Sequence, residues 1–184
     1  MSGSRPGCGR SSWRRLVGTV PLFSELIAGT TRSAVHLEAR DSYTPDDPAF
    51  LDWKAGRPVA APAGPAWYEL VREHAARGVE FRRARIVSEP LADYIRFEYE
   101  SAHWNVDAGE QVRWLNRNAA PGLLVPLADF WVLDDRLVRF GFFAGDGEFI
   151  GHELCDDPEV VRSCAEAFER VWGLAVPHDE YRPA

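Results

Sequence analysis

The stretch DFWVLDDRLVRFGFF, residues 129–143, decides the prediction of the fold. Two runs of aromatic and branched residues flank the adjacent carboxylates Asp134 and Asp135, and a third carboxylate, Asp129, opens the stretch. Aromatic and β-branched residues favour strands. Asp favours turns, because its side chain hydrogen-bonds the nearby backbone. The pattern therefore predicts two antiparallel strands joined at DDR by a tight turn with two exposed aspartates.

The residues that follow predict a further strand and a long helix. EFIGHELCDD, residues 148–157, reads as a strand joined to the previous one by AGDG. Asp157 is suited to an N-cap and Pro158 to the first position of a helix. The apolar residues of the next segment repeat at helical spacing; they are Val160, Val161, Cys164, Phe168 and Trp172.

The residues that precede the stretch alternate between helix and strand patterns. Helices are predicted from Pro21 to Gly29 and in two further segments that end at Gly56 and Gly78. Strands are predicted in SAVHLEARDSY, VEFRRARIVSEP and EQVRWLNR, with one helix over residues 91–109 between the last two. The chain is thus expected to be α+β or α/β, with a mixed sheet of roughly five to seven strands and flanking helices.

Length and composition predict one globular domain over residues 19–184. Within it, residues 19–78 form a helical and strand-containing N-terminal part, and residues 79–184 form the sheet and the C-terminal helix. Residues 1–18 are rich in Gly, Ser and Arg and are predicted to be a disordered extension.

The formal net charge of −7 is unevenly distributed. Residues 1–40 contain six Arg and two Glu, whereas the chain from residue 129 onward contains thirteen acids and five Arg. An acidic C-terminal third repels a phosphate backbone, so we expect no direct binding to nucleic acid. No apolar run reaches the ~20 residues of a membrane helix, and no clear cleavage site follows the N-terminal residues. The sequence therefore predicts a cytoplasmic protein without membrane contact.

Motifs for metals and cofactors are absent from the sequence. Cys8, Cys155 and Cys164 lack CxxC spacing, and the five histidines form no HxH or HExxH pair. The chain also has no GxGxxG, P-loop or GxSxG motif. We therefore predict no metal site and no cofactor.

Two polar blocks, HLEARDSY (residues 36–43) and RIVSEPLADYIRFE (residues 85–98), contain the candidate ligand-binding residues. Arginine binds carboxylate or phosphate bidentately, and tyrosine donates a further hydrogen bond. The blocks thus predict a pocket for a small acidic or aromatic ligand. The alternative is that Arg–Glu pairs merely join a helix to the sheet. The six candidates are Arg40, Tyr43, Arg85, Glu89, Tyr94 and Arg96.

An enzymatic site is the other possibility. Asp129, Asp134 and His152 lie on neighbouring predicted strands, where they would form an acid–base group if a desolvated carboxyl or imidazole had a pKa near the working pH. The sequence leaves this site and the plain turn open as alternatives.

The C-terminal two-thirds resembles a phospholipase-D-like domain, in which a strand hairpin precedes a helix with a similar DPxVVxxxxxxFExxW run. Active members of that superfamily carry His-x-Lys-x-x-x-x-Asp. If Asp134 occupies the position of the motif's Asp, Asp129 stands at the Lys position and Leu127 at the His position. The resemblance therefore implies a degenerate copy that has lost the catalytic side chains.

A second resemblance covers roughly residues 20–181 and rests on SAVHLEARDSY, RRARIVSEPLADYIRFEYESAHWNVDAGEQVRWL, DFWVLDDRLV and DPEVV…FERVWGLAVPHDEY. These blocks are similar to a family of actinobacterial proteins of unknown function that are often encoded beside helix-turn-helix regulators. The resemblance implies a non-catalytic ligand-sensing or partner-binding module that acts with a separate regulator. A small-molecule enzyme of specialised metabolism is the alternative.

Overall fold

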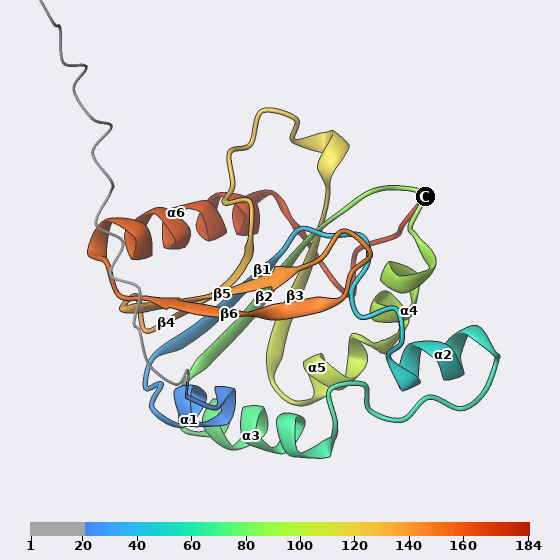
Figure 1. Ribbon diagram of the computed structural model, residues 1–184, viewed down its shortest axis with the longest axis horizontal. Helices are drawn as coiled ribbons and strands as arrows, with labels where there is room; N and C mark the ends of the chain where they lie inside the picture. The colour runs from blue at the N-terminus through green and yellow to red at the C-terminus, as the bar shows by residue number, and fades with distance from the viewer. Residues whose placement is uncertain (1–20) are drawn as a thin grey trace, which may run out of the picture.

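The computed structural model describes residues 21–184, and it consists of one mixed sheet with helices on both faces (Figure 1). The seven strands lie in the order β6-β5-β4-β1-β2-β3-β7. This arrangement confirms the predicted fold class. The predicted disordered extension over residues 1–18, and Cys8 within it, lie outside the described residues.

The elements follow the predicted order closely. The strands are β1 (Ser33–Glu38), β2 (Glu80–Val87), β3 (Glu110–Asn116), β4 (Asp129–Leu133), β5 (Leu137–Phe143), β6 (Phe149–Cys155) and β7 (Val176–Pro177). The helices are α1 (Phe23–Ala28), α2 (Pro48–Lys54), α3 (Pro65–Ala76), α4 (Asp93–Ser101), α5 (His103–Asp107) and α6 (Pro158–Leu174), with a 3-10 turn at Arg117–Ala119. The single helix predicted over residues 91–109 is wrong, since the chain turns at Ala102 between α4 and α5.

The sheet has a parallel half and an antiparallel half that meet at β1. Strands β1, β2 and β3 pair in parallel, and the connections between them carry α2 with α3 and α4 with α5. On its other side β1 pairs antiparallel with β4, which leads into the hairpins β4–β5 and β5–β6. Strand β1 therefore has a parallel neighbour on one side and an antiparallel neighbour on the other, and at the far edge β3 likewise lies between parallel β2 and the short antiparallel strand β7.

Among the described helices, α6 alone covers one face of the sheet (Figure 1). Because strand side chains alternate between faces, every second residue of the central strands points to α6. The buried sheet residues on this face are Val35, Leu37, Ala84, Ile86, Leu115, Phe130, Val132, Val138 and Cys155. They pack against the predicted apolar stripe of the helix, of which Cys164 and Phe168 are buried. Asp157 caps the helix by accepting from the N–H groups of Glu159 and Val160, as predicted.

The turn between β4 and β5 confirms the predicted hairpin but not the exposure of both aspartates. Asp134 and Asp135 have φ of 54° and 52°, and the Arg136 N–H donates to the Leu133 carbonyl at 3.0 Å. Positive φ at both central residues is the geometry of a type I′ turn, which matches the twist of paired strands. Asp135 is exposed, whereas Asp134 is buried.

Asp134 fastens the start of β1 to this turn. Its carboxylate accepts from the backbone N–H groups of Thr31, Arg32 and Ser33 at 3.0, 2.7 and 3.1 Å. Burial alone would raise the pKa of the Asp134 carboxyl, but these hydrogen bonds outweigh it and hold the pKa below its usual value. Asp134 is thus a structural acceptor that is already saturated by the backbone.

Candidate functional site

The sheet face opposite α6 carries a row of charged and polar side chains beneath helices α1 to α5. They stand at the alternate positions of six neighbouring strands, between the apolar residues that face α6. From the parallel half to the edge of the antiparallel half, they are Glu110, Arg83, Arg85, His36, Glu38, Asp129, Arg139 and His152. Charged residues seldom occupy such a face, because burying a charge costs free energy unless it is paired.

Four of these side chains, together with Glu98 of α4, form an arginine–glutamate cluster. Arg83 donates to Glu38 and to Glu110, each at 2.9 Å, and Arg85 lies 3.0 Å from the same oxygen of Glu38. Arg85 also forms a short ion pair with Glu98. No side chain of the cluster is more than 13% exposed. Two guanidinium groups thus face three carboxyl groups in the protein interior.

The carboxyl groups of the cluster differ in how readily they ionise. Burial opposes the charge of Glu38, but Arg85 and Arg83 outweigh it and hold its pKa well below the usual value. Burial raises the pKa of Glu98 to about 7, because the attraction of Arg85 does not offset it and the nearby negative charge of Glu38 raises the pKa further. Glu98 is therefore the member of the cluster that takes up a proton near neutral pH.

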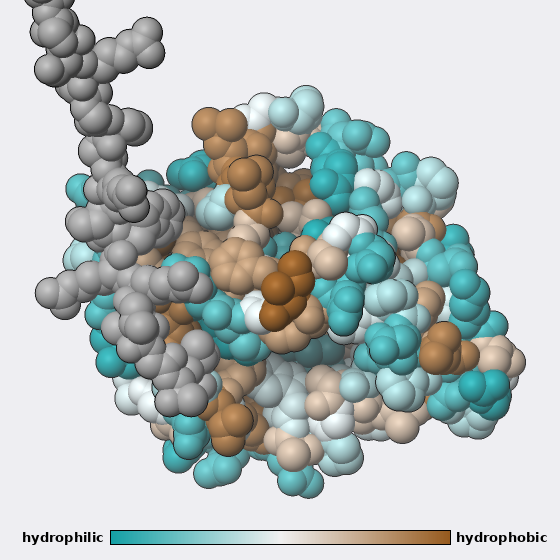
Figure 2. Space-filling view, viewed as in Figure 1, coloured by the Kyte–Doolittle hydropathy of each residue, from teal (hydrophilic) through white to brown (hydrophobic). Residues whose placement is uncertain are grey.

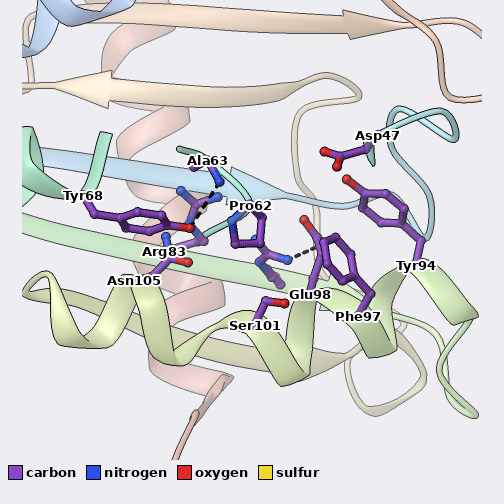
Figure 3. A pocket seen from close by; sticks show the side chains of 11 residues that line it. Asp47, Pro62, Ala63, Tyr68, Arg83, Tyr94, Phe97, Glu98, Ser101 and Asn105 are labelled. Carbon is purple, nitrogen blue, oxygen red and sulfur yellow. Dashed lines mark hydrogen bonds and ion pairs between the residues drawn. The ribbon is translucent and has the colours of Figure 1, made fainter. Parts of the chain in front are cut away.

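A pocket of about 180 Å³ lies above this cluster and is called the arginine pocket below. In Figure 3, Tyr68, Arg83 and Asn105 lie at one end of it and Asp47, Tyr94 and Glu98 at the other, with Pro62 and Ala63 of the loop after α2 across the middle. The pocket is also lined by Arg85, Phe97 and Ser101. It offers both hydrogen-bond donors and acceptors beside three aromatic rings. Figure 2 shows a recess in the surface between the sheet and the helices on this side.

A second cavity of about 120 Å³, the inner chamber, lies toward the antiparallel half and shares Glu38 with the cluster. Asp129 lines it and accepts from the Ala39 N–H at 2.9 Å. Burial raises the pKa of Asp129 to about 6, although the neighbouring Tyr43 hydroxyl works against the rise. Across the chamber Arg139 makes a short hydrogen bond to Nε2 of His152, whose pKa burial lowers to about 4. Buried His36 also has a pKa well below its usual value.

The structure brings two of the three predicted acid–base residues together. Asp129 and His152 both line the inner chamber. Asp134 stands at the opposite end of β4 from Asp129, and at ~3.4 Å per residue this separates the two along the strand by about 17 Å. Leu127, at the position of the motif's His, is fully exposed and lines neither cavity.

The six predicted ligand-binding residues divide into two groups. Arg85 and Tyr94 line the arginine pocket, and Tyr43 lines the inner chamber. Tyr94 contacts the Thr44 hydroxyl at 3.3 Å, and Tyr43 accepts from the Arg40 N–H at 3.1 Å.

The other three predicted residues line neither cavity. The Arg40 guanidinium donates to the Ala144 carbonyl at 2.9 Å. Glu89 accepts from Asn116 at 2.6 Å and from the Tyr181 hydroxyl. Arg96 lies on the exposed side of α4. Arg40 thus joins two loops, and Glu89 joins the loop after β2 to the end of β3 and to the C-terminal segment.

Several residues of the site were missed from the sequence, among them Arg83, Tyr68 and Asn105, which line the arginine pocket, and Glu110, which pairs with Arg83. The signal for Arg83 was present, since EFRRARIV places Phe81, Arg83, Arg85 and Val87 on one strand face. Tyr68 and Asn105 carry no such signal, because only the packing of α3 and α5 on the sheet brings them to the pocket.

The family of the chain follows from a comparison with family models. The model described as a domain of unknown function, DUF6879, matches residues 21–183. The chain belongs to this family. A search of the curated proteins finds no match.

Solved structures with a similar chain path are distant in sequence. A phospholipase D family member, Nuc from Salmonella typhimurium, has a TM-score of 0.48 at 16% identity, over 86% of this chain and 88% of that one. NucT from Helicobacter pylori has a TM-score of 0.47 at 13% identity, over 84% and 87%. TrmBL2, an archaeal chromatin protein, has a TM-score of 0.48 at 12% identity, over 84% of this chain and 49% of that one. The likeness concerns the chain path and assigns no chemistry to the DUF6879 chain.

Two features are absent from residues 21–184. No group of three or more His, Cys, Asp or Glu side chains in this part of the chain is arranged to hold a metal ion. None of its helices is both long and apolar enough to cross a membrane.

Proposed function

We propose that this chain is a non-catalytic module that binds a small acidic ligand in the arginine pocket and acts with a separate helix-turn-helix regulator. The observation that carries the proposal is the Arg85–Glu98 pair beneath the pocket. Arg85 is a buried cation whose second carboxylate partner has a pKa of about 7. Because Glu98 is easily protonated, the carboxylate of a ligand can replace it as the second partner of Arg85.

The charge balance of the cluster favours such an exchange. With Glu98 ionised, Arg83 and Arg85 face three negative carboxylates; with Glu98 protonated, they face two. If a monoanionic ligand binds while Glu98 takes up a proton, Arg83 and Arg85 again face three negative groups. The net buried charge then stays the same as with Glu98 ionised. Binding is therefore expected to consume a proton and to strengthen as the pH falls through about 7.

The size and walls of the pocket indicate a ligand with a single ring. A cavity of about 150 Å³ in another protein holds one benzene molecule, and the arginine pocket measures about 180 Å³. The rings of Tyr68, Tyr94 and Phe97 line it, and aromatic side chains pack well against a flat ring. An aromatic carboxylate of benzoate size fits both the charge and the volume.

The experiment is calorimetric titration of the full chain with benzoate. Because one proton is taken up, affinity should be about tenfold weaker at about pH 8 than at about pH 6. Neutral benzyl alcohol should bind without this pH dependence. Glu98→Gln, which imitates the protonated side chain, should bind benzoate equally well at both pH values.

Two further variants locate the site. Ser101→Phe places a ring into the pocket and should abolish binding, whereas Arg96→Ala, on the exposed side of the same helix, should leave it unchanged. Absence of benzoate binding at the lower pH, or undiminished binding in Ser101→Phe, overturns the proposed ligand class and site.

The regulator partnership is supported by the sequence resemblance stated above and by the charge distribution. The acidic C-terminal third disfavours contact with a phosphate backbone, so a partner would supply the DNA contact. The test is co-purification of the chain with helix-turn-helix regulators from the same genome. The recovered amount should change when benzoate is added, and equal recovery with benzoate and with benzyl alcohol contradicts ligand control of the complex.

Acid–base catalysis is the second candidate function, and a specific observation favours it. The pKa of Asp129 is about 6 and that of Glu98 about 7, so both carboxyl groups exchange protons near neutral pH. An enzyme of small-molecule metabolism would use Asp129 in the inner chamber. Its test is turnover of a panel of ring carboxylates followed by NMR: conversion by the native chain that Asp129→Asn abolishes establishes it, and no conversion excludes that panel.

A further inference from the structure

An apolar groove of about 860 Å³ lies on the side of the sheet that α6 covers, away from both polar cavities. Its walls are the loop before β4, the far end of β5, one residue of β6 and the first turns of α6. They contribute Pro126, Leu127 and Ala128, then Phe140, Phe142 and Glu153, and finally Asp157, Glu159, Val160, Ser163 and Cys164.

The groove leaves large apolar side chains in contact with solvent. Leu127 is fully exposed and Phe142 is 36% exposed, and Leu124, which lies in the same loop as Leu127 but outside the groove lining, is 82% exposed. Single exposed apolar residues are ordinary on protein surfaces, whereas a contiguous group around a groove marks a binding surface. Figure 2 shows hydrophobic residues gathered on the loop above the sheet and on the neighbouring strand edge.

The charged residues that line the groove are all acidic. Among its lining residues Glu153, Asp157 and Glu159 are acidic, and none is basic. Glu159 is exposed at the rim, while the Asp157 carboxylate also caps α6. Such a surface attracts a partner that is basic around an apolar stripe.

We infer that this acidic groove binds a basic amphipathic helix of a partner protein. Helices that dock in grooves present apolar residues at positions i, i+3 or i+4 and i+7, and here Leu127 and Phe142 would contact that stripe while Glu159 pairs with flanking lysine or arginine. A ligand of one or two rings would leave exposed Leu124 uncovered. A second copy of the chain in a symmetric dimer would bring two acidic rims together.

The inference rests on the partner-binding part of the proposed function and not on its ligand. None of the groove residues lines the arginine pocket. Failure of the experiment below therefore leaves a benzoate result intact, and failure of benzoate binding leaves this inference standing.

The test measures binding of a labelled synthetic helix by fluorescence anisotropy to the full chain. The probe has about five turns, with leucine along one face and lysine on the others. One control peptide carries glutamate in place of lysine, and a second has the same composition in scrambled order. The probe should bind more tightly than both controls, and its affinity should fall as salt is raised.

Variants of exposed residues keep the test independent of folding. Leu127→Lys should weaken binding of the probe at least about tenfold, and Glu159→Lys should weaken it several-fold at low salt. Leu174→Lys, at an exposed leucine at the other end of α6, is the control and should bind as the native chain does.

Three outcomes overturn the inference. Equal binding of the probe and the scrambled peptide would show mere charge attraction, and unchanged affinity in Leu127→Lys would place binding elsewhere. A concentration-dependent dimer in sedimentation that Leu127→Lys abolishes would assign the groove to a second copy of the chain.

Discussion

The two faces of the central sheet use the same strands for different purposes. On the face toward α6, residues such as Leu37, Val132 and Phe168 are apolar and buried, and each contributes about 1.5–3 kcal/mol by leaving water. On the opposite face, Arg83 and Glu38 are buried too, yet two buried charges gain little net stability from their pairing. The apolar face therefore stabilises the fold, and the polar face keeps a set of charged groups that stability alone does not require.

Removing the aromatic centre of the apolar face should have one of the largest effects. Phe168→Ala deletes a fully buried ring between α6 and the sheet, and we expect a loss of about 3–5 kcal/mol in the free energy of unfolding in urea. Where the variant is folded, its affinity for benzoate should equal that of the native chain. Weaker benzoate binding would show that the two faces are not separate in function.

Removing the centre of the polar face should cost as much for another reason. Arg83→Met leaves Glu38 and Glu110 buried without this partner, and breaking a buried pair costs about 3–5 kcal/mol. Glu110 forms its ion pair with Arg83, whereas Glu38 keeps Arg85. Urea unfolding of Arg83→Met/Glu110→Gln should therefore recover much of the loss. A double variant as unstable as the single one would mean that the packing of Arg83, not its charge, matters.

In the turn that joins β4 to β5, substitution of only one of the two aspartates should lower the stability of the fold. Asp134→Ala removes the acceptor of three backbone N–H groups, with an expected loss of about 2–3 kcal/mol. Asp135→Asn changes an exposed side chain and should lie within about 0.5 kcal/mol of the native chain. Thermal or urea unfolding measures both, and equal effects would refute the structural role assigned to Asp134.

The pH dependence of the unfolding free energy should show the raised pKa of Glu98. Its pKa is about 7 in the folded chain, above the ~4.3 of an exposed glutamate. Between these values the folded chain holds a proton that the unfolded chain has released, so the unfolding free energy falls as the pH rises through that window.

Glu98→Gln should lessen this fall by on the order of 2 kcal/mol between about pH 5 and about pH 8 in urea unfolding. Asp129, with a raised pKa of about 6, would account for a residual slope of the same sign. Glu100→Gln, an exposed neighbour on α4 whose side-chain oxygen accepts from the Trp53 indole, is the control and should leave the slope as it is in the native chain. A slope as steep in Glu98→Gln as in the native chain would contradict the raised pKa.

The sequence predicted most of the fold, because its signals are local. Alternation predicted β1 and β2, Asp157 and Pro158 marked the start of α6, and the aspartate pair marked the hairpin turn. The break at Ala102 and the two-residue strand β7 were missed. Neither has a periodic pattern of its own, since tertiary contacts determine both.

The candidate site could be predicted only in part for a similar reason. Arg85 and Tyr94 were recognised as polar residues within apolar segments, and both line the arginine pocket. Arg96 has the same local pattern, but the rotation of α4 turns it to solvent. The raised pKa of Glu98 follows from burial next to Glu38, sixty residues earlier in the chain, which no local pattern indicates.

The position of β1 has a consequence for how the chain can be divided. Strand β1 belongs to the first third of the sequence, yet it lies between β2 and β4 and pairs with both. A fragment that begins at residue 79 would retain six strands but expose two unpaired edges in the middle of its sheet. Unpaired edges recruit other strands, so such a fragment should aggregate, and adding a separate β1 peptide should fill the gap and restore a soluble species.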